Sequence, residues 1–167
     1  MPMIPVTLPG GESILLSAGG QNNLIKKIVE EFCPRFTPGG KIIYIGDAGD
    51  KLNEKELMYF EQLGIKIDRH GKMPDLIVAV PDKKWLVLIE AVTSHGPIDI
   101  KRHNELQELF GKGEYGLVFV TAFEGRKAMH KYLNEIDWES EVWVSEAPSH
   151  LIHFNGERFL GPYSDKE

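Results

Sequence analysis

Apolar residues along this chain follow two spacings, one typical of helices and the other typical of buried strands. Apolar residues three or four positions apart predict a helix over residues 22–33, which Pro34 ends. The same spacing predicts further helices over residues 53–63, 99–111 and 124–133. Short and nearly continuous apolar runs predict strands over residues 41–46, 76–80, 85–92 and 116–121, followed by short strands at 142–144 and 151–154.

The order of these elements indicates the fold class. A turn at residues 81–83 joins two apolar runs directly, so those runs should form an antiparallel hairpin. Helices alternate with the other strands, and strands buried on both faces need a helical layer on each side. The pattern therefore predicts an α/β fold with a mixed β-sheet flanked by helices.

Residues 1–20 differ from the rest, because they combine glycines and prolines with a short alternating pattern. This composition predicts a hairpin or an edge strand, or a linker from something upstream. The main domain is then expected over residues 21–160. A chain of 167 residues is the size of one domain and can bury a substantial core.

Composition and charge exclude several classes of protein. The chain has no apolar run near the ~20 residues that cross a bilayer, and Met1 begins no signal-like segment. A single cysteine, Cys33, suits a reducing cytoplasm. The net charge is −6, from 19 basic and 25 acidic residues. This excess of acids rules out a coat of positive charge for DNA, but it leaves room for a local basic cleft.

A first candidate site is the turn at residues 46–51, which contains Gly46, Asp47, Asp50 and Lys51 between a buried strand and a helix. Nucleotide-binding turns have this form, and Asp68 follows at about the spacing of a ribose-binding acid. The third glycine of that fingerprint is absent. The turn is therefore open to three readings: a tight turn with helix-capping aspartates, a phosphate or cofactor turn, or an acidic contribution to a neighbouring site.

A second candidate site is the pair Asp75 and Glu90. Asp75 begins one strand of the predicted hairpin and Glu90 ends the other, so the two carboxylates should converge. Glu90 follows five apolar residues in a strand that should be buried, and burial of an unpaired carboxylate is costly. Two convergent carboxylates suit Mg²⁺, which takes one or two carboxylates plus waters and phosphate oxygens. A buried ion pair with a cation explains the same residues equally well, the candidates being Lys51, Lys84 and Arg102.

The loop and helix that follow Glu90 suit contact with phosphates. Ser94 and His95 lie in a loop that ends at a Gly-Pro pair, and Lys101 and Arg102 lie in the first turn of the next helix. The apolar stripe of that helix places Arg102 on its inner face and Lys101 at the mouth of the site. No nucleophile elbow surrounds the Ser-His pair, so we do not expect acyl-transfer chemistry.

These segments together resemble a known family. The Met-Pro-Asp run at 73–75, the string EAVTSHGP at 90–97, and Lys101-Arg102 look like the catalytic domain of type II restriction endonucleases typified by BsuBI and PstI. The similarity spans roughly residues 5–160. It implies the αβββαβ core of the PD-(D/E)XK nucleases, built around a Mg²⁺ site held by Asp75 and Glu90.

The resemblance carries further implications and one departure. The lysine expected two residues after the acid is replaced by Val92, so Lys101, Arg102 or Lys51 would have to act in its place. Family members cut double-stranded DNA at a specific site, act as homodimers, and work beside a methyltransferase that modifies the same site without binding the nuclease. They usually carry an additional N-terminal domain, whose boundary would fall within residues 1–20. We expect basic side chains to gather around the carboxylates, drawn from Lys51, Arg69, Lys72, Lys101 and Arg102.

Two alternatives remain at this point. The turn at residues 46–51 favours a Rossmann-like methyltransferase that binds a nucleotide or S-adenosylmethionine. Val92 in place of the lysine favours a DNA-binding module that has lost catalysis. Cleavage of DNA with Mg²⁺, transfer of a methyl group, or binding alone would separate these readings.

Overall fold

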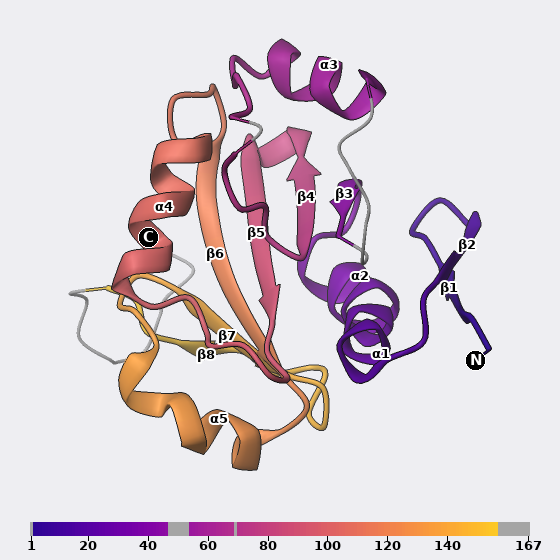
Figure 1. The fold of residues 1–167 in the computed structure, drawn as a ribbon, viewed down its shortest axis with the longest axis vertical. Coiled ribbons are helices and arrows are strands. Elements are labelled where there is room, and N and C mark those ends of the chain that lie inside the picture. Colours follow the sequence, from indigo (N-terminus) through magenta and orange to yellow (C-terminus); the bar gives the residue numbers. More distant parts are fainter. Residues whose placement is uncertain (1, 47–53, 69, 157–167) are drawn as a thin grey trace, which may run out of the picture.

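A computed structural model describes residues 2–46, 54–68 and 70–156. Its centre is a six-stranded mixed sheet, shown in Figure 1, whose strands lie side by side in chain order. Three antiparallel strands come first, and β6 and β7 then follow β5 in parallel. The strands are β3 (Lys41–Ile45), β4 (Leu76–Val80), β5 (Trp85–Ala91), β6 (Gly116–Phe123), β7 (Glu141–Val144) and β8 (Ile152–His153).

Helices cover both faces of this sheet (Figure 1). On one face, α1 (Gly20–Lys27) and α2 (Cys33–Phe36) bury their apolar residues against β4, β5 and β6. On the other face, α3 (Glu54–Gln62) and α4 (Ile100–Phe110) pack on the opposite side chains of the same strands. A third apolar cluster joins α5 (Arg126–Tyr132) to β7 and to Val92. The predicted fold class, including the αβββαβ order of α1, β3, β4, β5, α4 and β6, is confirmed.

The first helix differs from its prediction. Pro34 does not end it, because the chain forms a π-helical segment over Ile28–Phe32 and then continues as α2 to Phe36. A proline inside an α-helix lacks the N–H group for one bond and clashes with the carbonyl four residues earlier. The wider π turn shifts the hydrogen bonds by one residue just before the proline, so that the Cys33 N–H donates to the carbonyl of Ile28.

The N-terminal segment pairs with itself and stays outside the main sheet. Strands β1 (Ile4–Thr7) and β2 (Ser13–Leu16) form a two-stranded antiparallel sheet. Val6 and Leu16 are buried in the apolar cluster of α1 and α2. The hairpin is therefore attached to the helical layer.

The topology also decides against the methyltransferase alternative. A dinucleotide-binding fold needs two parallel strands joined by a crossover helix. Here β3 and β4, which flank α3, are antiparallel. The glycine turn after β3 does not open such a unit, and residues 47–53 themselves lie outside the described part of the chain.

Of the described residues, none belongs to a helix long and apolar enough to span a bilayer.

Candidate active site

The β4–β5 hairpin brings Asp75 and Glu90 together. Leu76 pairs with Ile89, so the same register continued by one residue sets Asp75 opposite Glu90. The two strands have this register because they are joined by a short 3-10 turn, Pro81–Lys83, and a left-handed Lys84 with φ of 54°. The two carboxylates lie at the end of the hairpin away from the turn.

Two hydrogen bonds hold the carboxylate of Asp75. Gln21, in the first turn of α1, donates from Nε2 to Oδ1 at 2.7 Å, and the backbone N–H of Ala91 donates to Oδ2 at 2.8 Å. The backbone carbonyl of Asp75 accepts from the N–H of Gly46 at 2.8 Å. No local pattern in the sequence pointed to Gln21, because only the packing of α1 against the sheet brings it to Asp75, 54 residues away along the chain.

Arg102 on α4 forms an ion pair with Glu90 on β5. Its Nη2 lies 3.2 Å from Oε1 of Glu90, and both side chains are nearly buried, at 8% and 12% exposed. Its Nη1 donates to the backbone carbonyl of Lys72 at 2.9 Å. Asp99 caps α4 by accepting a bond from the Arg102 N–H at 2.8 Å, which sets the start of the helix. Of the three cations considered for this pair, Arg102 is in contact, Lys84 lies at the turn end of the hairpin, and Lys51 is outside the described residues.

The pair of carboxylates carries more negative charge than Arg102 neutralises. Burial, together with the negative charge of Asp75, raises the pKa of Glu90 to about 7 in spite of the opposing effects of Arg102 and Lys72. Burial also raises the pKa of Asp75, against the opposing effects of the Ala91 N–H bond and nearby cations. Two crowded carboxylates with one arginine favour the approach of another cation.

The donor set fits Mg²⁺. Among the described residues there is no cluster of three or more histidine, cysteine or acidic side chains. Mg²⁺ does not need one, because it is bound through one or two carboxylates and completes its shell with water and phosphate oxygens. Asp75 and Glu90 are the residues that could hold it.

An open pocket of about 540 Å³ lies beside Asp75. It is lined by the residues that lead into α1, by Met73 and Pro74, and by Thr93 and Ser94 in the loop after β5. Ser94 and His95 are both exposed, and the charge of His95 acts on Asp75. The loop is therefore open to solvent next to the carboxylates.

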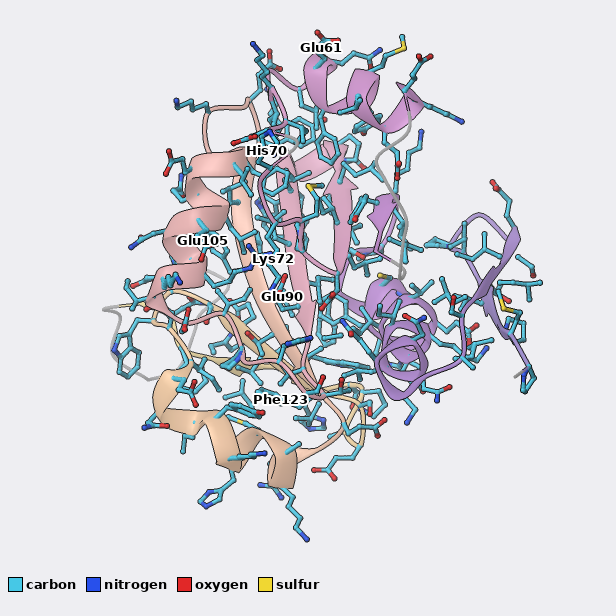
Figure 2. The ribbon with its side chains drawn as sticks, in the orientation of Figure 1. Glu61, His70, Lys72, Glu90, Glu105 and Phe123 are labelled. Carbon is cyan, nitrogen blue, oxygen red and sulfur yellow. The ribbon has the colours of Figure 1, made fainter. Side chains whose placement is uncertain are left out.

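The three remaining candidate cations occupy different places. Lys101 is exposed on α4 beside the buried Arg102, as the helical spacing predicted. Lys72 is exposed too, but its positive charge lowers the pKa of both Asp75 and Glu90. Figure 2 shows Lys72 and Glu90 close together beside α4. Arg69 lies outside the described residues. Lys72 was expected among the basic side chains near the site but not as a substitute for the missing lysine. Its position three residues before Asp75 was the available signal.

Known proteins resemble this chain over almost its whole length. The family model described as the BsuBI/PstI restriction endonuclease domain matches residues 4–157. The type II restriction enzyme BsuBI of Bacillus subtilis is 57% identical over 160 residues, which are 96% of this chain and 51% of that protein. The type II restriction enzyme AplI of Arthrospira platensis is 35% identical over 158 residues, covering 89% of this chain and 48% of that protein.

A solved structure agrees with this result. The SdaI restriction endonuclease superposes with a TM-score of 0.88 at 54% identity, covering 96% of this chain and 51% of that chain. This chain thus spans about half the length of the relatives it matches.

Proposed function

This chain belongs to the BsuBI/PstI restriction endonuclease family, and on that basis we propose that it is the catalytic domain of a Mg²⁺-dependent type II restriction endonuclease. It hydrolyses phosphodiester bonds of double-stranded DNA at a specific site. The observation that carries the proposal is the convergence of Asp75 and Glu90, with Glu90 nearly buried against Arg102 and Asp75 lining an open pocket.

Asp75 and Glu90 hold the metal ion in this proposal. When bound there, Mg²⁺ supplies positive charge to the phosphate and lowers the pKa of a bound water. Gln21 and the Ala91 N–H orient the carboxylate of Asp75, and Arg102 orients that of Glu90. These bonds restrict the two side chains before DNA arrives, which is the preorganisation that metal ligands need.

Cations around the carboxylates act on the DNA. Val92 is apolar and buried, so it cannot bind the attacking water. Lys72 is a candidate substitute, because its charge acts on both carboxylates and its side chain, unlike that of Arg102, is exposed. Lys101 and Arg102 stabilise negative charge on the phosphate that is cut. Other phosphate oxygens of the DNA backbone are contacted by Lys51, Ser94 and His95.

The same proposal includes the oligomeric state, the accompanying methyltransferase and the cellular compartment. A two-fold symmetric homodimer matches the symmetry of a palindromic DNA site. A methyltransferase modifies the same DNA site and does not bind this chain. The enzyme acts in the cytoplasm, where Cys33 stays reduced.

Digestion of plasmid DNA tests the proposal. The chain should cut in Mg²⁺ and not in EDTA, and sequencing of the fragment ends should show one shared sequence. Retained DNA binding without cleavage in Mg²⁺ or Mn²⁺ would show a binding module instead. Transfer of a labelled methyl group without cleavage would overturn the nuclease assignment.

A further inference from the structure

Helix α5 carries an unusual concentration of positive charge for this chain. Four of its seven residues are basic and none is acidic, although the whole chain has a net charge of −6. The four basic side chains are all exposed, and its Met129 faces the protein interior. They are Arg126, Lys127, His130 and Lys131.

The first turn of α5 runs against the usual helical preference. Acidic side chains are favoured near a helix N-terminus, because the backbone N–H groups there carry partial positive charge. Arg126 and Lys127 occupy that turn instead. Departures from local preference of this kind often mark a functional surface.

The acids near α5 are already engaged with other groups. Glu146 accepts a hydrogen bond from the backbone N–H of Arg126 at 2.8 Å, so it caps the helix. Glu124 lies 3.3 Å from Nζ of Lys27 on α1. Across the part of the chain that the structure describes, the side chains of Arg126, Lys127 and Lys131 form no ion pair with a carboxylate. Nζ of Lys131 lies 5.5 Å from the centre of the Tyr132 ring. The three cations therefore lack a carboxylate partner among the described residues and can bind an anionic partner.

Helix α5 lies at the end of the sheet that holds the carboxylates. Glu90 pairs with Thr121 on β6, and α5 begins shortly after that strand ends. Met129 of α5 shares an apolar cluster with Val92, two residues after Glu90. Figure 1 shows α5 below the lower ends of β5 and β6, beneath β7 and β8. The basic surface and the candidate active site thus share one end of the molecule.

We infer that the surface of Arg126, Lys127 and Lys131 on α5 binds the phosphate backbone of duplex DNA that flanks the cut site. The inference rests on the proposed nuclease function and adds to it a binding element outside the carboxylate site. Duplex DNA is the partner that the placement favours, because the surface adjoins the residues that would act on a phosphodiester. Contacts of this kind fix the position of the duplex and carry no base specificity.

Binding of DNA at several salt concentrations tests the inference. The triple variant Arg126→Gln, Lys127→Gln and Lys131→Gln removes three positive charges from α5. The matched control, Lys66→Gln, Lys83→Gln and Lys112→Gln, removes three exposed positive charges from the opposite end of the sheet. Fluorescence anisotropy of a labelled duplex in EDTA gives the affinity without cleavage, and circular dichroism verifies that all three proteins are folded.

Each phosphate contact that a variant loses reduces the magnitude of the slope of log affinity against log salt by about 0.9. The α5 variant should therefore lose up to about 2.7 from that slope, which is roughly 40-fold in relative affinity over a fourfold change in salt. The control variant should keep the slope of the unaltered chain.

Three results would overturn the inference. An α5 variant with the slope of the unaltered chain would show that α5 does not contact DNA and would leave the nuclease proposal standing. An equal loss in both variants would show that only total charge matters. No DNA binding by the unaltered chain would overturn both proposals, and plasmid digestion would then fail as well.

Discussion

The two ends of the β4–β5 hairpin differ in how far their charged side chains are exposed to solvent. At the turn end, Asp82, Lys83 and Lys84 are exposed, and Nζ of Lys83 lies 4.4 Å from the centre of the Trp85 ring. At the other end, Asp75 and Glu90 lie under neighbouring elements and take hydrogen bonds from α1 and α4. One pair of strands therefore has a solvated end and an end where carboxylates are withdrawn from water.

The difference is informative because burial of a charge costs free energy, whereas exposure of a charge costs almost nothing. The turn end can keep its charged residues for solubility alone. The carboxylate end needs a compensating gain, and Arg102 balances only one of its two negative charges. The proposed cation site would supply such a gain.

The largest expected effect comes from removing a carboxylate at the buried end. Glu90→Ala should lower the rate of Mg²⁺-dependent DNA cleavage by about 10³-fold or more, because it removes a metal ligand worth several kcal/mol in the transition state. Asp82→Ala, which removes an exposed acid from the turn end, should leave the rate unchanged. Single-turnover cleavage of plasmid DNA measures both. Equal rates in the two variants would remove the functional distinction between the ends.

Two lysines near the carboxylate end and one at the turn end sharpen the comparison. Lys72→Met should lower the single-turnover rate by about 10²-fold at saturating DNA, the lower range for loss of acid–base help, because Lys72 is the candidate to serve the attacking water. Lys101→Met should chiefly weaken DNA binding, since we assign it to phosphate contact. Lys83→Met at the turn end is the matched control and should change neither quantity. If Lys101→Met abolishes the rate and Lys72→Met does not, the two roles are exchanged.

Stability should respond differently to the loss of a cation at the two ends. Arg102→Met leaves Glu90 without its partner and removes a donor from the Lys72 carbonyl, so it should lower the free energy of unfolding by about 3 kcal/mol. Lys83→Met removes only an exposed cation–π contact and should cost less than about 1 kcal/mol. Urea unfolding in EDTA compares the two. Similar losses would mean that the Arg102–Glu90 pair is no more important to the fold than a surface contact.

The pH dependence of stability gives a gradual effect, spread over the interval between the unfolded and folded pKa values of Glu90. Without metal, the folded protein keeps a proton on Glu90 up to its raised pKa of about 7, whereas the unfolded chain releases it near the ordinary value of 4.5. The folded state therefore binds more protons between these values, and its stability should fall as pH rises through that window.

The Glu90→Gln variant isolates this contribution. It should lack the decline, which amounts to at most about 1.4 kcal/mol per pH unit for one proton. Thermal unfolding in EDTA at several pH values measures the difference, and Asp82→Asn is the control. Parallel curves for the unaltered chain and Glu90→Gln would show that Glu90 is already ionised throughout this range.

Local features of the sequence were enough to predict the hairpin and the approach of its two carboxylates. The apolar runs identify β4 and β5, and the short turn between them leaves little choice of register. The cap at Asp99 and the stripe on α4 were likewise sufficient to predict that Arg102 faces inward and Lys101 faces out. The prediction that the first helix ends at Pro34 was wrong. A π turn, which has no clear sequence signal, relieves the clash that a proline normally causes.

Periodicity and a short connection were sufficient to predict the strands of the main sheet, the meeting of Asp75 and Glu90, and the need of Glu90 for a partner. The packing of the helices was needed to show that Arg102 pairs with Glu90, that Gln21 donates to Asp75, and that the charge of Lys72 acts on both carboxylates. Those contacts join α1, α4 and the loop before β4, which are distant along the chain. Their positions depend on how two helical layers pack on opposite faces of one sheet, and no local pattern specifies that packing.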